Sequence, residues 1–176
     1  MTAAGIPAPA APGYVAETLA LLGTQDPIAI LSETPAWLAA RIEGRSLAQL
    51  RKPEGPGKWS LVQVLSHLAD TELAYGWRAR MILTASQPPI QGFDQGAWLD
   101  RFDYASDDPA LALQTFTTLR HWNLRVWRGA TSPADLARVG MHSERGPESL
   151  DILRRLAAGH DLRHRRQIER LLKVIS

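Results

Sequence analysis

The chain has 176 residues, a formal net charge of +2 and no cysteine. This length is enough for one domain with a sizeable hydrophobic core and too short for two ordinary domains. The missing cysteine excludes disulfides, a thiolate nucleophile and zinc–thiolate clusters, so any metal must be bound by His, Asp or Glu.

Residues 1–13 are rich in Ala, Pro and Gly and lack periodicity, which predicts a flexible N-terminal tail before a single domain over residues 14–176. The N-terminus has neither the basic start nor the apolar region of a signal peptide. No run approaches the ~18 apolar residues that a membrane-spanning helix needs. We therefore expect a cytoplasmic protein with no membrane partner.

Apolar side chains at helical spacing predict the main helices. Residues 14–50 form one broken helix or two pieces, because Gly and Pro interrupt the pattern. After the linker KPEGPGK, Ser60 is expected to cap a helix that runs to about residue 86. A third helix covers about 109–129, and Ser149 begins the last one. No alternating strand pattern and no internal repeat is found, so we expect an all-α, four-helix bundle.

An aromatic loop is predicted between the second and third helices. Pro88 and Pro89 end the second helix, and Asp107 and Asp108 start the third. The aromatic residues between them are Phe93, Trp98, Phe102 and Tyr104. A loop this rich in aromatic residues usually packs over another part of the protein. Trp98 could belong to a ligand cage, although core packing is the more common role.

His160 and His164 lie four residues apart on the last helix, so their side chains share one face. Leucines fall on the same stripe, whereas the opposite side carries Arg154, Arg155, Arg165 and Arg166. The histidine pair therefore faces the core. Two buried imidazoles are costly unless their ring nitrogens find partners, and protonating both would place like charges in a low dielectric. A metal ion resolves both problems.

His67 is the candidate third ligand, since a stable metal site usually takes ligands from more than one helix. It lies on or near the inward stripe of the second helix. His121 and His142 lack such a context and are expected at the surface or behind the ligands. A lone buried histidine is more often a hydrogen-bonded core residue than a ligand. Three histidines on bundle stripes, in a chain without cysteine, favour a metal site.

Two segments resemble the DinB/YfiT-like family of metal-dependent proteins. Residues 57–72, GKWSLVQVLSHLADTE, resemble the Trp-Ser opening of that family's second helix and its metal-binding histidine. Residues 146–168, GPESLDILRRLAAGHDLRHRRQI, resemble its final helix with a His-Asp-x-x-His pair. The resemblance implies an up-down-down-up four-helix bundle in which His67, His160 and His164 are the metal ligands.

Three imidazole ligands leave a divalent ion at least one position for water or substrate, which is typical of a catalytic site. Such an ion activates either water or a thiol. The family includes enzymes that use the low-molecular-weight thiols bacillithiol or mycothiol, and without cysteine any sulfur nucleophile must arrive as a cosubstrate. We therefore predict S-transferase or hydrolase activity on a small-molecule substrate. Zinc is the default ion, with nickel or manganese as alternatives.

Polar residues near the ligands suggest supporting roles. Asp70 and Gln167, each about one turn from a ligand, are the candidate catalytic residues and, with Thr71, could orient water or substrate. Asp161 could accept a ligand's second N–H and fix its tautomer. Arg78 could pair with an anionic cosubstrate, although such an arginine more often lies at a boundary with its head in water.

Two other functions stay open. A metal in a bundle can be purely structural, so the chain could be a non-catalytic metal-stabilised or dimerisation module that assembles as a homodimer. Arginine outnumbers lysine, which raises nucleic-acid binding as a rival. However, the arginines of the last helix share their face with Asp151 and Glu169, and no nucleic-acid motif is present. No nucleic-acid partner is therefore expected.

Overall fold

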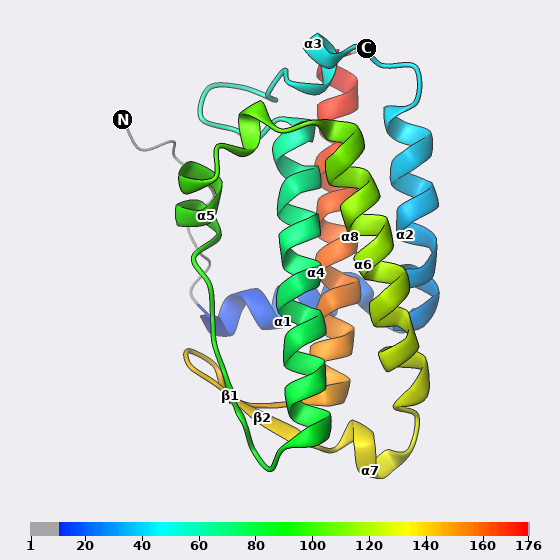
Figure 1. The fold of residues 1–176 in the computed structure, drawn as a ribbon, viewed down its shortest axis with the longest axis vertical. Helices are drawn as coiled ribbons and strands as arrows, with labels where there is room; N and C mark the ends of the chain where they lie inside the picture. Colours follow the sequence, from blue (N-terminus) through cyan, green and yellow to red (C-terminus); the bar gives the residue numbers. More distant parts are fainter. Residues whose placement is uncertain (1–10, 176) are drawn as a thin grey trace.

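The computed structural model describes residues 11–175, which form a helical bundle with a small sheet near one end (Figure 1). The helices are α1 (Ala11–Leu22), α2 (Pro27–Ile42), α3 (Leu47–Leu50), α4 (Leu61–Thr84), α5 (Gln95–Arg101), α6 (Pro109–Gly129), α7 (Pro133–Leu136) and α8 (Leu150–Ile175), with a 3-10 turn η1 (Tyr104–Ser106). The strands are β1 (Pro89–Ile90), β2 (Val139–His142) and β3 (Gly146–Ser149). Within the described residues, no helix is long and apolar enough to cross a membrane.

Four long helices make the bundle, and Figure 1 shows α2 and α8 running one way while α4 and α6 run the other. In chain order this is up-down-down-up, so the expected bundle and its topology are confirmed. α4 packs against α6 and α8, and α2 packs against the same two helices. α1 lies across the bundle and packs on α8 (Figure 1).

Local sequence signals set the helix starts. Ser60 caps α4 as expected, because its hydroxyl accepts the backbone N–H of Gln63 while the Gln63 side chain accepts the Ser60 N–H. Asp108 accepts a backbone N–H in the first turn of α6. The hydroxyl of Ser149 does the same for α8. These predicted boundaries are therefore confirmed.

The N-terminal region differs from the sequence-based prediction at two points. Residues 11–13 were expected in the tail and instead open α1, while residues 1–10 of that tail lie outside the described residues. The stretch expected as one broken helix or two pieces contains three helices. Gly23 and Gly44 follow the ends of α1 and α2 with φ of 56° and 72°, a left-handed conformation that suits glycine.

A three-stranded sheet was not predicted from the sequence. β2 and β3 form an antiparallel hairpin, and β1 lies parallel to β2 with Pro89 opposite Met141. β1 belongs to the long connection that returns from the end of α4 to the start of α6. The predicted aromatic loop in that connection contains α5 and η1. Strands of two to four residues carry no recognisable alternation, so only pairing between distant segments reveals them.

Two apolar clusters fill the core, and buried polar residues separate them. One cluster includes Leu31 and Trp127, and the other includes Leu65 and Phe116. On each long helix the polar positions fall between residues of the two clusters: Thr34 on α2, Thr71 and Glu72 on α4, Arg120 and Asn123 on α6, and His160, Asp161 and His164 on α8. A buried polar layer therefore crosses the middle of the bundle.

Gly159 lets α1 lie against α8. A Cβ added at this position would lie 2.3 Å from the carbonyl oxygen of Thr18, a backbone atom that cannot move aside cheaply. The side chain after Gly159 on α8 is His160, so the close approach brings α1 next to the polar layer.

Candidate metal centre

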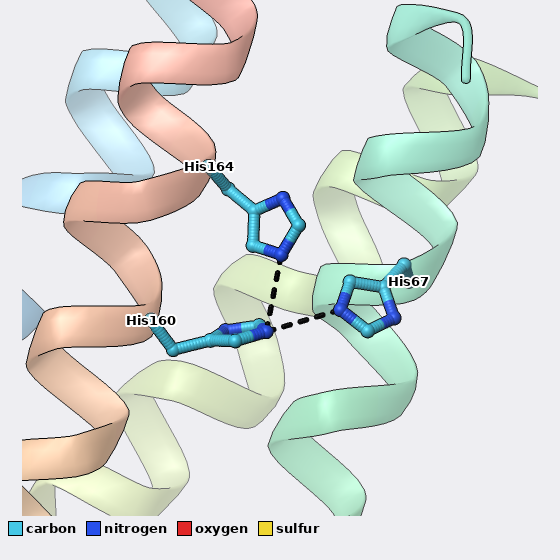
Figure 2. A group of neighbouring side chains, drawn as sticks. All are labelled: His67, His160 and His164. Carbon is cyan, nitrogen blue, oxygen red and sulfur yellow. Dashed lines mark hydrogen bonds between the residues drawn. The ribbon is translucent and has the colours of Figure 1, made fainter. Parts of the chain in front are cut away.

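Three histidines meet in the polar layer, one from α4 and two from α8 (Figure 2). The Nε2 atom of His160 lies 3.0 Å from Nε2 of His67 and 3.1 Å from Nε2 of His164. Each side chain offers one ligand atom, and these atoms all lie within 4.8 Å of one another. The four-residue spacing aligns the pair on α8. The packing of α4 against α8 supplies the third ring.

Burial keeps the three imidazoles neutral. It holds the pKa of His67 and of His160 well below the ordinary value, and the neighbouring His164 lowers both further. Burial also lowers the pKa of His164 to about 4, although the hydrogen bond to Gln167 and the charge of Asp161 act in the opposite direction. At neutral pH the rings therefore carry lone pairs rather than positive charges, which is the protonation state that metal binding requires.

Gln167 determines which nitrogen of His164 carries the proton. Its Oε1 atom lies 2.8 Å from Nδ1 of His164, and an amide oxygen can only accept, so Nδ1–H donates to it. The Nε2 atom of His164 is then left unprotonated, facing the other two rings. Nδ1 of His67 is buried and has no hydrogen-bond partner among the described residues. At least the Nε2 atom of His164 therefore presents a lone pair to the cluster.

Trp59 covers the side of the cluster toward the start of α4. Its ring stacks parallel on His164, with centroids 6.3 Å apart, and meets His67 edge-on at 5.1 Å. Trp59 is itself buried. This large apolar ring excludes water from one side of the imidazoles, which strengthens every electrostatic interaction at the site.

A buried ion-pair network lies in the same polar layer. Arg120 donates to both carboxylate oxygens of Asp161, at 2.6 and 2.9 Å, and to Glu72 at 2.8 Å. Asn123 donates to the other Glu72 oxygen at 3.0 Å. Burial by itself would lower the pKa of Arg120, but the two carboxylates raise it above its ordinary value. The network therefore pairs one arginine with two carboxylates.

Asp161 therefore does not orient a ligand in the way suggested by the sequence. Both of its oxygens accept from Arg120, and no described hydrogen bond joins it to an imidazole. Its charge still reaches the cluster, because it raises the pKa of His164. The network acts on the rings in both directions, because Arg120, after burial and the other two histidines, lowers the pKa of His160.

A pocket of about 100 Å³ opens onto the cluster. Its lining includes two of the three histidines, His67 and His160. The remaining lining residues are Tyr14, Thr71, Tyr75, Arg78, Gly92, Phe93, Gln95, His142, Glu144 and Arg145. The imidazoles are therefore buried but reachable by a small molecule.

The two candidate catalytic residues lie in different places. Gln167 contacts the Nδ1 atom of a candidate ligand, so it orients the ring itself. Asp70 accepts a hydrogen bond from the Tyr104 hydroxyl and lines a separate groove beside Trp98. The structure thus does not bring Asp70 to the imidazoles. Thr71 does lie at the cluster, with its Oγ1 atom 3.4 Å from Nε2 of His67.

The other two histidines, His121 and His142, lie in different environments. His121 is exposed on α6. His142 is buried on β2 and lines the pocket, although it is not part of the histidine cluster. No pattern in the sequence indicated this position, because β2 itself was not predicted.

The arginines of α8 are less solvated than expected. Arg154 pairs with Asp151 at 2.6 Å. Arg155 donates to a backbone carbonyl after α1, and Arg165 donates to a threonine hydroxyl and a carbonyl on α2. Of the predicted group of four, only Arg166 is exposed. Contacts within the chain thus account for most of this cluster.

Known proteins of similar sequence are described as metal-dependent. Residues 30–168 match the DinB superfamily. A Bacillus subtilis protein named "Putative metal-dependent hydrolase YfiT" is 35% identical over 86 residues, which cover 49% of this chain and 48% of that protein. The chain thus spans about half the length of that relative. A Geobacillus kaustophilus protein described as a "Putative metal-dependent hydrolase" is 28% identical over 152 residues, covering 85% of this chain and 84% of that protein.

A solved structure is also similar. It is YfiT from Bacillus subtilis, described as "a probable metal-dependent hydrolase with an unusual four-helix bundle topology". The two structures superpose with a TM-score of 0.78 and 27% sequence identity, over 84% of this chain and 85% of that one.

Proposed function

The chain belongs to the DinB superfamily, and we propose that it is a metal-dependent enzyme in which His67, His160 and His164 hold one divalent ion. The observation that carries this proposal is the convergence of three neutral imidazoles, with Nε2 atoms 3.0 and 3.1 Å apart. Lone pairs this close repel one another unless a proton or a cation lies between them. The description of several relatives as a "Putative metal-dependent hydrolase" supports the same proposal of a metal-dependent enzyme.

The donor set fits a small divalent ion. Two imidazole nitrogens bound tetrahedrally to zinc at about 2.0–2.1 Å lie about 3.3 Å apart. The observed separations of 3.0 and 3.1 Å need only a small outward shift, and the third pair of ligand atoms, from His67 and His164, lies within 4.8 Å. Zinc is our first choice, and nickel and manganese are the alternatives.

The ion, when bound, supplies a Lewis acid that favours the deprotonated form of water or of a thiol. The chain's own residues prepare that chemistry. Gln167 holds His164 with its Nε2 lone pair toward the site, and Trp59 shields the rings from water. The pocket at His67 and His160 admits a small-molecule substrate. The activity is then that of a hydrolase, or of an S-transferase whose thiol, such as bacillithiol or mycothiol, is a cosubstrate because the chain has no cysteine.

Access to the site favours an enzyme over the non-catalytic alternative. A structural metal site is closed by protein ligands, whereas a catalytic site keeps a position open. Within the described residues the cluster offers three nitrogens, and the pocket reaches two of the rings. A metal-stabilised or dimerisation module would need no such opening.

Metal content and turnover together test this function. Untagged protein should carry about one divalent ion per chain by elemental analysis, or take one up from zinc, nickel or manganese salts. The loaded protein is then assayed with bacillithiol, mycothiol and glutathione against model electrophiles, beside ester and amide hydrolysis. Turnover that requires metal and is lost in His67→Ala, but not in the exposed-site control His121→Ala, supports the enzyme. Protein that takes up no metal overturns the proposal.

A further inference from the structure

The pocket extends well beyond the histidine cluster along one face of α4. His67, Thr71, Tyr75 and Arg78 recur at helical spacing, and all four line it. The Cα atoms of His67 and Arg78 are eleven residues apart, or about 16 Å along a helix axis. The pocket thus joins the imidazoles at one end to a basic group at the other.

Arg78 is a buried cation without a carboxylate partner among residues 11–175. Its side chain is on a residue only 6% exposed, so it does not reach out to water as a boundary arginine would. Its single described hydrogen bond runs from Nη2 to the carbonyl oxygen of Gln91, at 2.7 Å. The guanidinium lies 5.9 Å from the ring centres of Tyr75 and Phe93. Burial lowers the pKa of Arg78, which reflects the cost of this position.

The other charged groups at this end do not neutralise Arg78. Arg145 makes a two-pronged ion pair with Glu148, with both N–O distances 2.9 Å, so the one buried carboxylate nearby is already used. Glu144 lines the pocket but is exposed to solvent and forms no described ion pair. The charge of Arg78 is therefore left for a ligand.

His142 adds an unpaired donor to the same end. Its Nδ1 atom accepts the backbone N–H of Glu144 at 3.1 Å, so a neutral ring carries its proton on Nε2. That Nε2 atom is buried and has no partner among the described residues. Burial lowers the pKa of His142, which keeps the ring neutral. Arg78 and His142 therefore place unpaired N–H donors at the same end of the pocket. A ligand with hydrogen-bond acceptors matches these donors.

We propose that this pocket binds an elongated small molecule that carries an oxyanion group, a carboxylate or a phosphate, which Arg78 holds while the reacting end lies at the imidazoles. The inference rests on the proposed function only for the placement of the reacting end. The guanidinium fork suits both carboxylate and phosphate oxygens. An interaction this far from the reacting atoms would position the substrate and contribute binding energy to catalysis.

Binding of matched charged and neutral probes tests the assignment. Hexanoate, hexyl phosphate and the neutral hexanamide are titrated into the protein by calorimetry, both zinc-loaded and after chelation, with folding checked by circular dichroism. We expect at least one of the two anions to bind about tenfold or more tightly than the amide in both forms. Comparing hexanoate with hexyl phosphate tells which oxyanion is preferred. The chelated protein removes direct binding of the anion to the metal as an explanation.

Variants of Arg78 test whether this residue produces the preference for the anions over the amide. In Arg78→Gln the ratio of affinities should fall to near one, and in Arg78→Lys, which keeps the charge without the fork, it should be intermediate. The matched control is Arg125→Gln, an exposed arginine on α6 that stacks on Trp122, and it should keep the full ratio. If Arg78→Gln does not fold, the Lys variant carries the comparison.

An undiminished anion preference in Arg78→Gln, or in Arg78→Lys where the Gln variant does not fold, overturns the inference, and so does the absence of any preference in the wild-type protein. Failure of the proposed function looks different: the protein takes up no metal, yet the chelated form still prefers the anion in an Arg78-dependent way.

Discussion

The Oε1 atom of Gln167 lies 2.8 Å from the Nδ1 atom of His164, one turn along the same helix. This contact sets the tautomer of the His164 imidazole. Groups that hold the far nitrogen of a ligating histidine commonly tune metal affinity by 10–100-fold. The role of Gln167 can therefore be tested by measuring metal affinity, without an assay of turnover.

Gln167→Leu removes the acceptor while keeping much of the side-chain volume. We expect the metal dissociation constant to rise roughly 10–100-fold, with helical content unchanged. Gln167→Glu, which keeps an acceptor at the same reach, should stay close to the wild type. The control is Gln114→Leu, on the exposed side of α6. Equal metal affinity in Gln167→Leu and the wild type would contradict the role of this contact.

His160→Ala and His164→Ala should each abolish tight metal binding and leave the helical content largely intact, because the two apolar clusters on either side of the polar layer remain. Metal uptake is followed by elemental analysis after dialysis, and the fold by circular dichroism. His121→Ala, at an exposed position, should bind metal normally. Loss of the fold with metal retained elsewhere would remove these side chains from the ligand set.

The metal-free protein should lose stability as the pH falls from about 6.5 toward 4. The folded-state pKa of His164 is lowered from 6.5 to about 4, and those of His67 and His160 are lowered as well. In this window the unfolded chain binds protons that the folded chain does not, so the free energy of unfolding rises with pH. For His164 alone the change is on the order of 3 kcal/mol.

Urea unfolding of chelated protein at several pH values between 4 and 7.5 measures this slope. His164→Gln removes one titrating group and should flatten it. A stability that is independent of pH across the window would mean that the imidazoles titrate normally in the folded chain.

Arg120→Met should destabilise the protein by about 3–5 kcal/mol, because it leaves Glu72 and Asp161 buried without their counter-charge. Chemical denaturation of the metal-free protein gives the value. Arg125→Met makes the same change at an exposed position and should cost less than about 1 kcal/mol. A small effect at Arg120 would show that the two carboxylates take up protons or water when the arginine is removed.

Gly159→Ala should destabilise the protein by about 1–3 kcal/mol, since the new Cβ would meet the carbonyl oxygen of Thr18 at 2.3 Å. Gly129→Ala is the matched control, because an added Cβ there meets nothing within 4 Å. Alanine is also the better helix former, so this control should be neutral or slightly stabilising. Thermal melts of the two variants side by side provide the test, and similar melting temperatures would exclude a close approach of α1 to α8.

Local features of the chain could be predicted from the sequence because they depend on residues within one or two helical turns. The cap at Ser60, the start of α8 at Ser149 and the shared face of His160 and His164 all follow from helix geometry alone. The same locality explains why the sequence did not reveal where Asp70 lies. It lies three residues from His67, about 60° away around the helix, and that rotation turns it into the neighbouring groove with Tyr104.

Only the tertiary structure decided what meets across the bundle. His67 is 93 residues from His160, and the packing of α4 on α8 brings their Nε2 atoms to 3.0 Å. The pairing of Arg120 with Asp161 and the place of His142 on a short strand likewise join distant segments. The sequence by itself determined α4, α6 and α8, the starts of these helices and an inward pair of histidines, and it offered His67 as a candidate third ligand. The contact of the third ring with the pair, the buried charge network and the pocket come from how the helices pack, because such contacts depend on helix rotation and register that no local pattern contains.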